Sequence, residues 1–328
     1  MTGVVGLPGT ATLAEVGERA VIATLTADLP PATDVLVGPG DDGAVLELAG
    51  PLVTSVDVLV ENVHFKLGWS DPADIGRKAV AVNVADLEAM GARATAIVLG
   101  FSAPPHLQLR WVREFAAGLQ AECAAAGVSL VGGDLTRSRD LTFSVTVLGG
   151  LDGRAPVLRS GARAGDVVAL RGRTGWAAAG LAVLSRGFRS PRAVVEAQRV
   201  PQVPYGQGAV AARAGATAMV DVSDGLLADL GHVAVASGVV VELRRDAFEV
   251  PEPLQTVSAA TGADPYDLLL TGGEDHALAA TFPGGAVPEG WRVVGEVRAA
   301  APDEATGVLV DGATWSAAGG FDHFGPAR

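Results

Sequence analysis

The segment at residues 150–165 divides the chain into two halves. Its sequence, GLDGRAPVLRSGARAG, is rich in glycine, arginine and proline and has neither helical nor strand periodicity. A chain of 328 residues is also longer than a single hydrophobic core usually supports. We therefore predict two domains, at residues 1–150 and 151–328.

Both halves alternate between strand-like and helix-like patterns. The first half has predicted helices at 12–25, 71–90 and 107–125, and predicted strands at 34–37, 44–48, 52–57, 95–101, 128–131 and 141–149. The second half has predicted helices at 175–186, 206–215 and 225–236, and predicted strands at 166–170, 217–221, 239–243, 278–282, 292–296 and 307–310. This alternation predicts two mixed α/β (α+β) domains.

Composition excludes several classes of protein. The net charge of −13 argues against a partner that is nucleic acid or an anionic membrane. The two lysines, Lys66 and Lys78, do not follow a glycine, which excludes a P-loop. Cys123 is the single cysteine, so no intrachain disulfide or thiolate cluster can form.

The distribution of apolar residues points to a cytoplasmic protein. Charged residues, glycine and proline interrupt every apolar run before it reaches the ~18 residues of a membrane helix. The first 25 residues lack the basic start and apolar stretch of a signal peptide. We expect a soluble protein that is not associated with a membrane.

The motif GPGDDG at residues 38–43 matches the glycine fingerprints of dinucleotide-binding proteins and protein kinases. The dinucleotide fingerprint requires a helix directly after the glycines, whereas the AVLEL that follows has the alternation of a strand. Asp41 and Asp42 would also repel a bare phosphate. The H-R-D and D-F-G motifs of protein kinases are missing. We reject both interpretations.

Aspartates recur beside glycine or hydroxyl residues where predicted elements end. The instances are GDD at 40–42, SVD at 55–57, GGD at 132–134, DVSDG at 221–225 and GGED at 272–275, with Asp86 inside a helix on the face shared with Asn83. Carboxylates gathered at strand ends are typical ligands of Mg²⁺. Turns, a helix cap at Asp224 and a solvated helix face at Asp86 are the alternatives.

Several Mg²⁺ ions would imply a polyphosphate partner, because cations must separate carboxylates from phosphates that share a pocket. Phosphoryl transfer uses metal ions in this way. Arg137 and Arg159, beside the acidic motifs, are candidate phosphate clamps, with ordinary surface charge as the alternative.

Taken in order, these motifs resemble the thiamine-monophosphate kinase family, within the superfamily of aminoimidazole ribonucleotide synthetase. The segments that carry the resemblance are GPGDDGAVL, TSVDVLVENVHF, DPADIGRKAVAVNVADLEAMGA, GGDLTRS, LRSGARAGD, DVSDGLLADL, GGEDHAL and GFDHF. The resemblance runs from near residue 12 to the C-terminus. It implies aminoimidazole ribonucleotide synthetase-like N- and C-terminal domains, ATP-dependent conversion of thiamine monophosphate to thiamine diphosphate with Mg²⁺, and a homodimer built through the N-terminal domains.

The resemblance also implies roles for individual residues. The implied Mg²⁺ ligands are Asp42, Ser55, Val56 through its carbonyl, Asp57, Asp86, Asp134, Asp221 and Asp224. The implied ATP contacts are Gly133, Asp134, Arg159 and Ser223, and the implied thiamine phosphate contacts are His64, Glu274 and Phe321. A packed turn histidine and a C-terminal anchor are the alternatives for His64 and Phe321.

The chain departs from the family pattern at a few positions. Val56 replaces a usual Thr or Ser, Leu135 a usual Thr, and His276 with Ala277 a usual Tyr-Glu pair. The last change lies beside Glu274, an implied substrate contact. A purine-pathway synthetase of the same superfamily and a non-catalytic protein that binds divalent cations remain the rival interpretations.

Overall fold

The structure is a computed structural model that describes residues 7–27, 29 and 33–316. The chain forms two compact units. Unit 1 falls within Met1–Leu87 and Arg93–Gly153, and unit 2 within Glu88–Ala92 and Arg154–Arg328. Both units combine helices with a sheet, so the predicted α/β fold class is confirmed.

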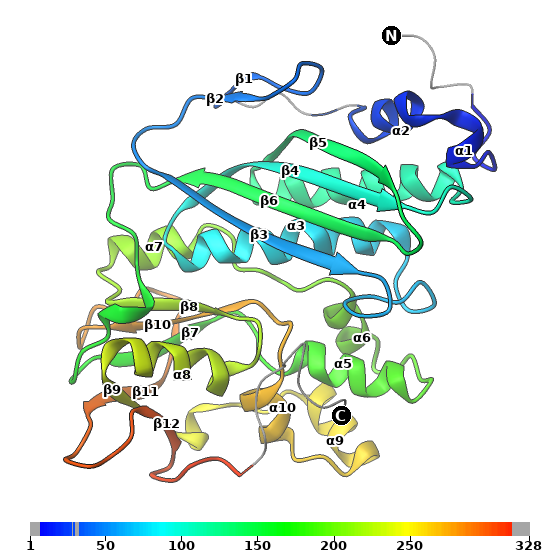
Figure 1. Ribbon diagram of the computed structural model, residues 1–328. Coiled ribbons are helices and arrows are strands. Elements are labelled where there is room, and N and C mark those ends of the chain that lie inside the picture. The colour runs from blue at the N-terminus through cyan, green and yellow to red at the C-terminus, as the bar shows by residue number, and fades with distance from the viewer. Residues whose placement is uncertain (1–6, 28, 30–32, 317–328) are drawn as a thin grey trace. The chain divides into compact units, whose positions relative to one another are not determined.

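Unit 1 is built on a four-stranded sheet. Its strands, in spatial order, are β3 (Leu52–Val60), β6 (Thr142–Gly150), β4 (Arg93–Ala103) and β5 (Ser129–Arg137). β6 is antiparallel to both of its neighbours, whereas β4 and β5 are parallel. Helices α3 (Pro72–Ala89) and α4 (Leu109–Ala126) lie along one face of this sheet (Figure 1). The smaller elements are α1 (Leu13–Val16), α2 (Glu18–Leu25), β1 (Val35–Val37) and β2 (Val45–Leu46).

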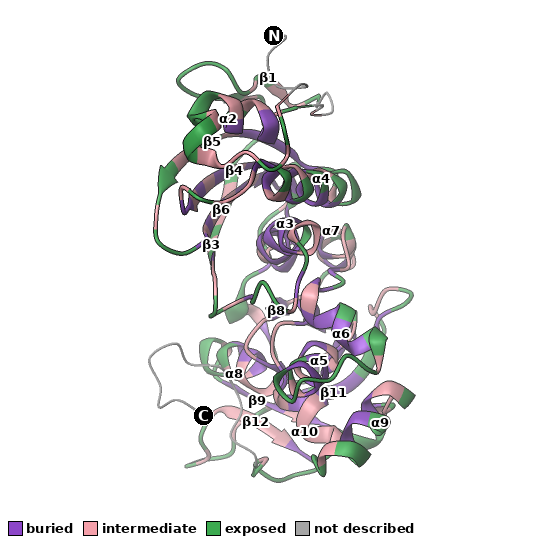
Figure 2. Ribbon diagram, turned by 90° about the vertical axis from the view of Figure 1, so that its right-hand side faces the viewer, coloured by how far each residue is buried: buried purple, intermediate pink, exposed green. Residues whose placement is uncertain are grey.

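Aromatic rings fill the space between the sheet and α4. The rings of Phe115 and Phe143 are stacked with centroids 4.6 Å apart, and Phe101 meets both of them edge-on. Figure 2 shows the buried side of α4 turned toward the sheet and its exposed side turned away. These contacts fix the sheet face toward which Ser55 and Asp57 of β3 point.

Helices α3 and α4 cross at two glycines. A Cβ atom added to Gly118 would lie 2.0 Å from the carbonyl oxygen of Ala73, and one added to Gly76 would lie 2.2 Å from that of Phe115. Only hydrogen in place of a side chain allows the two backbones to come this close. The crossing therefore sets the position of α3 over the sheet.

Unit 2 contains a six-stranded sheet. Its strands, in spatial order, are β12 (Gly307–Val310), β9 (Val239–Leu243), β11 (Arg292–Ala299), β7 (Val167–Arg171), β10 (Ala277–Phe282) and β8 (Ala218–Val222). All neighbouring strands are antiparallel except β12 and β9. The helices are α5 (Trp176–Ser185), α6 (Arg192–Arg199), α7 (Gln207–Arg213), α8 (Leu226–Ser237), α9 (Glu252–Thr261) and α10 (Pro265–Thr271), with 3₁₀ turns η1 (Arg159–Gly161) and η2 (Arg245–Ala247).

Different helices cover the two sides of this sheet. Helix α8 packs on β8, β9 and β12. On the other side, Ala211 of α7 joins a buried cluster with Met219, Leu278 and Phe282. Asp221 faces the same side of the sheet as Met219, because alternate residues of β8 point in the same direction. Leu278, which pairs with Asp221, faces this side too.

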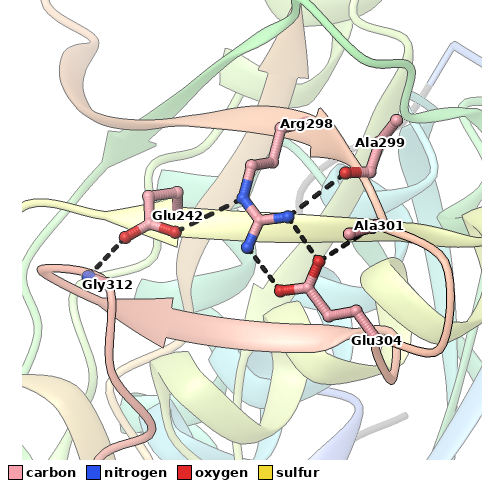
Figure 3. Close-up of polar contacts among 6 residues, drawn as sticks. All are labelled: Glu242, Arg298, Ala299, Ala301, Glu304 and Gly312. Atoms are coloured by element: carbon pink, nitrogen blue, oxygen red, sulfur yellow. Dashed lines mark hydrogen bonds and ion pairs between the residues drawn. The ribbon is translucent and has the colours of Figure 1, made fainter.

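An ion-pair network closes the loop between β11 and β12 (Figure 3). Arg298 donates two hydrogen bonds to the carboxylate of Glu304, at 2.7 and 2.5 Å. Its Nε lies 3.7 Å from Glu242, which in turn accepts the N–H of Gly312 at 2.5 Å. The fork geometry of the guanidinium fits this bidentate contact, and it lowers the pKa of Glu304 to about 2, mainly through the Arg298 hydrogen bonds.

Most elements agree with the predicted pattern. Strands β3 and β5 run past their predicted ends at residues 57 and 131, so Asp57 and Asp134 lie within strands and not at strand ends as predicted. The predicted helix at 12–25 is two helices, because Gly17 has a left-handed φ of 78° between them. Helices α6, α9 and α10 occupy regions where no element was predicted. In the described part of the chain, no helix is long and apolar enough to cross a membrane.

Candidate functional site

Strand β3 and helix α3 bring four polar residues together in unit 1. Alternate residues of β3 face the helix, and Asn83 and Asp86 share one helix face because they are three residues apart. The hydroxyl of Ser55 donates to Oδ2 of Asp86 at 2.6 Å, and the amide N–H of Asp57 donates to Oδ1 of Asn83 at 2.9 Å. Asp86 therefore faces the sheet, and the solvated-face alternative for it is wrong.

A second group of predicted residues surrounds a cavity of about 490 Å³ in unit 1. Asp42, in the loop between β1 and β2, lines it together with Gly133 and Asp134 of β5. A Cβ atom at Gly133 would lie 2.1 Å from the carbonyl oxygen of Leu99, so glycine is required for β5 to approach β4 here. The GDD and GGD motifs thus border one space.

The two groups lie at different strands of the same sheet. In the registers of the three strand pairs, Asp57 is opposite Val145, Val145 opposite Leu99, and Leu99 opposite Gly133. Three strand spacings separate Asp57 from Gly133 by about 14 Å. Asp57 and Asp134 are therefore placed on one sheet without direct contact.

His64 and Val56 lie at the margins of these groups. Nδ1 of His64 accepts the N–H of Val60 at 3.0 Å, and the carbonyl oxygen of His64 accepts a hydrogen bond from Lys78 at 3.2 Å. This bond at Nδ1 leaves the proton of a neutral imidazole on Nε2. The side chain of Val56 is 55% exposed on the sheet face opposite to Ser55 and Asp57.

In unit 2, the DVSDG and GGED motifs are joined by hydrogen bonds. The N–H of Glu274 donates to the carbonyl oxygen of Ser223 at 2.7 Å, and the N–H of His276 donates to that of Val222 at 2.9 Å. A Cβ atom at Gly273 would lie 2.4 Å from the same Ser223 oxygen. Contacts between segments about fifty residues apart along the chain thus fix the position of Glu274.

The backbone of the GGED segment has an uncommon conformation. Glu274 and His276 have φ values of 69° and 50°, in the left-handed region that non-glycine residues seldom adopt. Such strain persists only where the surroundings hold it, and it concentrates at functional sites. Here the hydrogen bonds to Val222 and Ser223 hold it. The imidazole of His276 also contacts Asp221, with Nδ1 3.0 Å from Oδ2.

Asp229 organises the turn that contains Asp224. Its Oδ2 accepts the N–H groups of Asp224 and Gly225, at 3.1 and 3.0 Å. The N-cap of α8 is Gly225, which places Asp224 one residue before the cap position. Burial raises the pKa of Asp229 to about 7, and the negative charges of Asp221 and Asp224 add to this effect.

Asp275 lies deeper in the same unit. Its Oδ1 accepts the N–H of Ala177, at the start of α5, at 2.9 Å. Its Oδ2 is buried without a hydrogen-bond partner among the described residues. Burial raises the pKa of Asp275 to about 7, although hydrogen bonds from the backbone N–H groups of Ala177 and Gly175 lower it. Asp275 therefore anchors the helix that follows the GRTG turn at residues 172–175.

The remaining predicted residues are placed as follows. Arg159 is exposed on η1. The carbonyl oxygen of Leu158, next to it in the chain, accepts a hydrogen bond from the N–H of Met219, which stands four residues before Ser223. Arg137 is exposed at the end of β5. Phe321 lies outside the described residues.

The predicted Mg²⁺ ligands divide between the two units. Unit 1 carries Asp42, Ser55, Val56, Asp57, Asp86 and Asp134, and unit 2 carries Asp221 and Asp224. Within residues 7–27, 29 and 33–316, no three His, Cys, Asp or Glu side chains are grouped so that they could hold a metal ion. Their chemistry fits Mg²⁺ nonetheless, because every donor in the set is an oxygen, from carboxylate, hydroxyl or carbonyl.

Sequence reasoning missed three residues of this region. Asp229 was not singled out because it resembles an ordinary polar residue of a helix, and Asp275 entered only as the last residue of the GGED motif, without a role of its own. His276 was noted only as a departure from the family pattern. The available signal for Asp229 was its place in the first turn of a helix directly after the DVSDG motif, where a carboxylate can accept unpaired backbone N–H groups.

Comparison with family models covers both units. The model described as AIR synthase related protein, N-terminal domain, matches residues 40–151. The model described as AIR synthase related protein, C-terminal domain, matches residues 163–304. The two matches together cover more than half of the chain.

Known proteins match along nearly the whole length. The thiamine-monophosphate kinase of Mycobacterium tuberculosis (strain ATCC 25618 / H37Rv) is 48% identical over 316 residues, which are 96% of this chain and 93% of that protein. The crystal structure of thiamine-monophosphate kinase from Stenotrophomonas maltophilia K279a has a TM-score of 0.75 and 31% identity, over 90% of this chain and 95% of that one. The structure of AaThiL complexed with AMPPCP and TMP has a TM-score of 0.76 and 29% identity, over 97% of this chain and 100% of that one.

Proposed function

This chain belongs to the thiamine-monophosphate kinase family of the AIR synthase related proteins, and from this membership we propose that it transfers the γ-phosphoryl group of ATP to thiamine monophosphate. The observation that carries the proposal is the 48% identity to a thiamine-monophosphate kinase over 96% of the chain. The structural relative in complex with AMPPCP and TMP, similar over 97% of the chain, supports the same two substrates.

We assign Mg²⁺ to the oxygen donors of the acidic motifs. Asp42, Asp57, Asp86 and Asp134 of unit 1, with Ser55 and the carbonyl of Val56, and Asp221 and Asp224 of unit 2 would hold it. Mg²⁺ supplies neutralisation of the phosphate charges and stabilises the transferring phosphoryl group. The hydrogen bonds from Ser55 to Asp86 and from His276 to Asp221 would orient two of these carboxylates.

The substrate contacts follow from the same residues. Gly133, Asp134, Arg159 and Ser223 would contact ATP, and His64, Glu274 and Phe321 would contact thiamine monophosphate. Two observations support the assignment: Gly133 presents bare backbone beside a cavity, and Glu274 is held in a constrained turn. His64 would contact the substrate from the turn that the hydrogen bond between its Nδ1 and the N–H of Val60 holds in place.

We propose direct in-line transfer for the chemical step. The acceptor is a phosphate oxygen, which is already anionic at neutral pH, so the reaction needs no general base. The protein then acts by positioning the two substrates and by stabilising charge. This assignment explains why the site motifs are carboxylates on sheets and turns rather than a nucleophile with its base.

We also propose that the chain acts as a homodimer in the cytoplasm. The outer face of β3 exposes apolar side chains, with Leu52, Val56 and Val58 at 52%, 55% and 43% exposure. A second copy of the same face would cover them. Light scattering at micromolar concentration should give the mass of a dimer, and a monomer would rule this interface out. A cytoplasmic location would supply the ATP.

The function is tested by incubating the purified protein with ATP, MgCl₂ and thiamine monophosphate and measuring thiamine diphosphate by chromatography. We expect product that depends on both ATP and Mg²⁺. Turnover of formylglycinamidine ribonucleotide instead would assign the chain to the purine-pathway synthetases. Mg²⁺ binding without ATP consumption in any arm would indicate a non-catalytic cation-binding protein.

A further inference from the structure

Three arginines of unit 2 surround one cavity that the proposed function does not use. The cavity has a volume of about 440 Å³, and Arg171, Arg173 and Arg292 line it together with Leu170, Gly172, Pro204 and Gly290. We propose that this cavity is a binding site for a phosphate-bearing small molecule.

The fold brings these arginines together at one end of the unit 2 sheet. Arg171 ends β7, and Arg292 begins β11 opposite Leu170. Gly172, with a φ of 106°, then makes a tight turn, and Arg173 after it lines the same cavity. The three positive side chains therefore come from two neighbouring strand ends and one tight turn.

Each guanidinium has a close contact with an uncharged group. Arg171 donates to the carbonyl oxygen of Gly290 at 2.6 Å. Arg173 lies over the ring of Trp176 at 4.5 Å from its centroid, and Arg292 over Phe248 at 5.7 Å. These contacts orient the planar groups. The guanidinium of Arg173 also interacts electrostatically with the buried carboxylate of Asp275.

The central observation is that these arginines have few carboxylate partners for their number. Across the described residues, none of the three arginines forms an ion pair, although the chain has 37 acidic residues for 24 positive ones. Like charges around one cavity repel each other and favour an anion between them. Phosphate is the anion that guanidinium groups bind in two-point contacts.

The size and position of the cavity suit a small ligand. Sites for small molecules commonly have volumes of ~300–1,000 Å³. Leu278 of β10 pairs with Arg171 on one side and with Asp221 on the other, which places Arg171 two strand spacings, about 10 Å, from Asp221. The bound phosphate could be a free anion or part of a larger metabolite, and both share the chemistry proposed.

The site can be tested without catalysis by calorimetric titration of the full chain with pyrophosphate in EDTA. Removal of divalent cations is decisive, because the acidic motifs then repel pyrophosphate and only arginines can hold it. We expect saturable binding at one site per chain. Arg173→Gln and Arg292→Gln should each weaken it about tenfold, and Arg213→Gln, an exposed arginine of α7 that causes the same loss of charge, should leave it unchanged.

Inorganic phosphate and thiamine monophosphate, titrated separately as competitors, identify the source of the phosphate group. Displacement of pyrophosphate by thiamine monophosphate would assign the cavity to a phosphorylated metabolite, and displacement by inorganic phosphate alone would assign it to a free anion. Absence of saturable binding, or an equal loss in Arg213→Gln, would overturn the proposal. Circular dichroism melting confirms that each variant is folded, and the exposed Arg292 provides a variant that leaves the core intact. Because EDTA stops the kinase reaction, this result is independent of the proposed activity.

Discussion

His276 and Asp221 form a buried pair, with Nδ1 of the imidazole 3.0 Å from Oδ2 of the carboxylate and both side chains 5% exposed. The family pattern has a tyrosine at position 276, so the histidine is a departure from it. The structure shows that the histidine contacts a proposed metal ligand directly. The backbone of His276 has a positive φ, and the hydrogen bond from its N–H to the carbonyl oxygen of Val222 supports this conformation.

Replacing this histidine should affect the use of metal as well as stability. His276→Phe keeps a ring and leaves a buried carboxylate without its partner, which should destabilise the fold by ~1–3 kcal/mol. It should also raise the Mg²⁺ concentration that gives half-maximal formation of thiamine diphosphate. His276→Asn, which tolerates a positive φ and keeps a donor, should restore part of both properties. A His276→Phe variant with unchanged Mg²⁺ dependence would show that the pair has only a structural role.

Asp275 should make the stability of the protein depend on pH. Its pKa is raised to about 7 in the folded state from an ordinary value of 3.8, so the folded protein holds one more proton between these values. Stability must then fall as pH rises through this window, because the charged form is buried. Asp275→Asn is neutral throughout, so relative to the wild type it should gain roughly 2–3 kcal/mol between pH 5 and pH 8.

Urea denaturation of both proteins at pH 5 and pH 8 measures this difference directly. Asp246→Asn, at an exposed aspartate of the same unit, controls for the change in net charge. A constant difference between Asp275→Asn and the wild type at the two pH values would contradict the burial of a titrating carboxyl at this position.

Two glycine-to-alanine substitutions in helices should have opposite effects on stability, because one lies at the crossing of α3 and α4 and the other lies in α8, away from it. Alanine is a better helix former than glycine by ~1 kcal/mol. Gly231 of α8 has open space around its Cα, so Gly231→Ala should stabilise the protein by up to about that amount. Gly118→Ala would place a methyl group 2.0 Å from a backbone oxygen of α3 and should destabilise it by ~1–3 kcal/mol or more. Thermal unfolding of both variants gives the signs, and a stabilised Gly118→Ala would contradict the close crossing.

Local signals in the sequence were sufficient for most of the fold. The start of α3 at Pro72 and the strand β12 at 307–310 match the predicted positions, because a helix start and a strand between turns have strong local signatures. Helix α6 was missed because it is eight residues long and lies between Pro191 and Pro201, where a loop is the usual interpretation.

The contacts within the site could not be predicted from the sequence in the same way. The resemblance to a family named Asp221 and Glu274 individually. The pairing of the segments around Ser223 and Glu274 depends on tertiary contacts between residues about fifty positions apart, for which local patterns give no signal. The role of Asp229 escaped for the same reason that Asp224 was considered as a cap: both stand beside the start of α8, and only the structure shows which carboxylate accepts the N–H groups.

The central claim is that carboxylates of the glycine–aspartate motifs hold Mg²⁺ for phosphoryl transfer to thiamine monophosphate. The most direct measurement is the turnover number for thiamine diphosphate formation at saturating Mg²⁺ in Asp57→Asn and Asp134→Asn, with Asp140→Asn, at an exposed turn of the same unit, as the matched control. Each of the first two should lose roughly 100-fold or more in kcat, because an electrostatic contact to the transition state is removed, while thermal unfolding and the Asp140→Asn control remain close to wild type. Near-normal turnover in both Asp57→Asn and Asp134→Asn would contradict the assignment of the metal site.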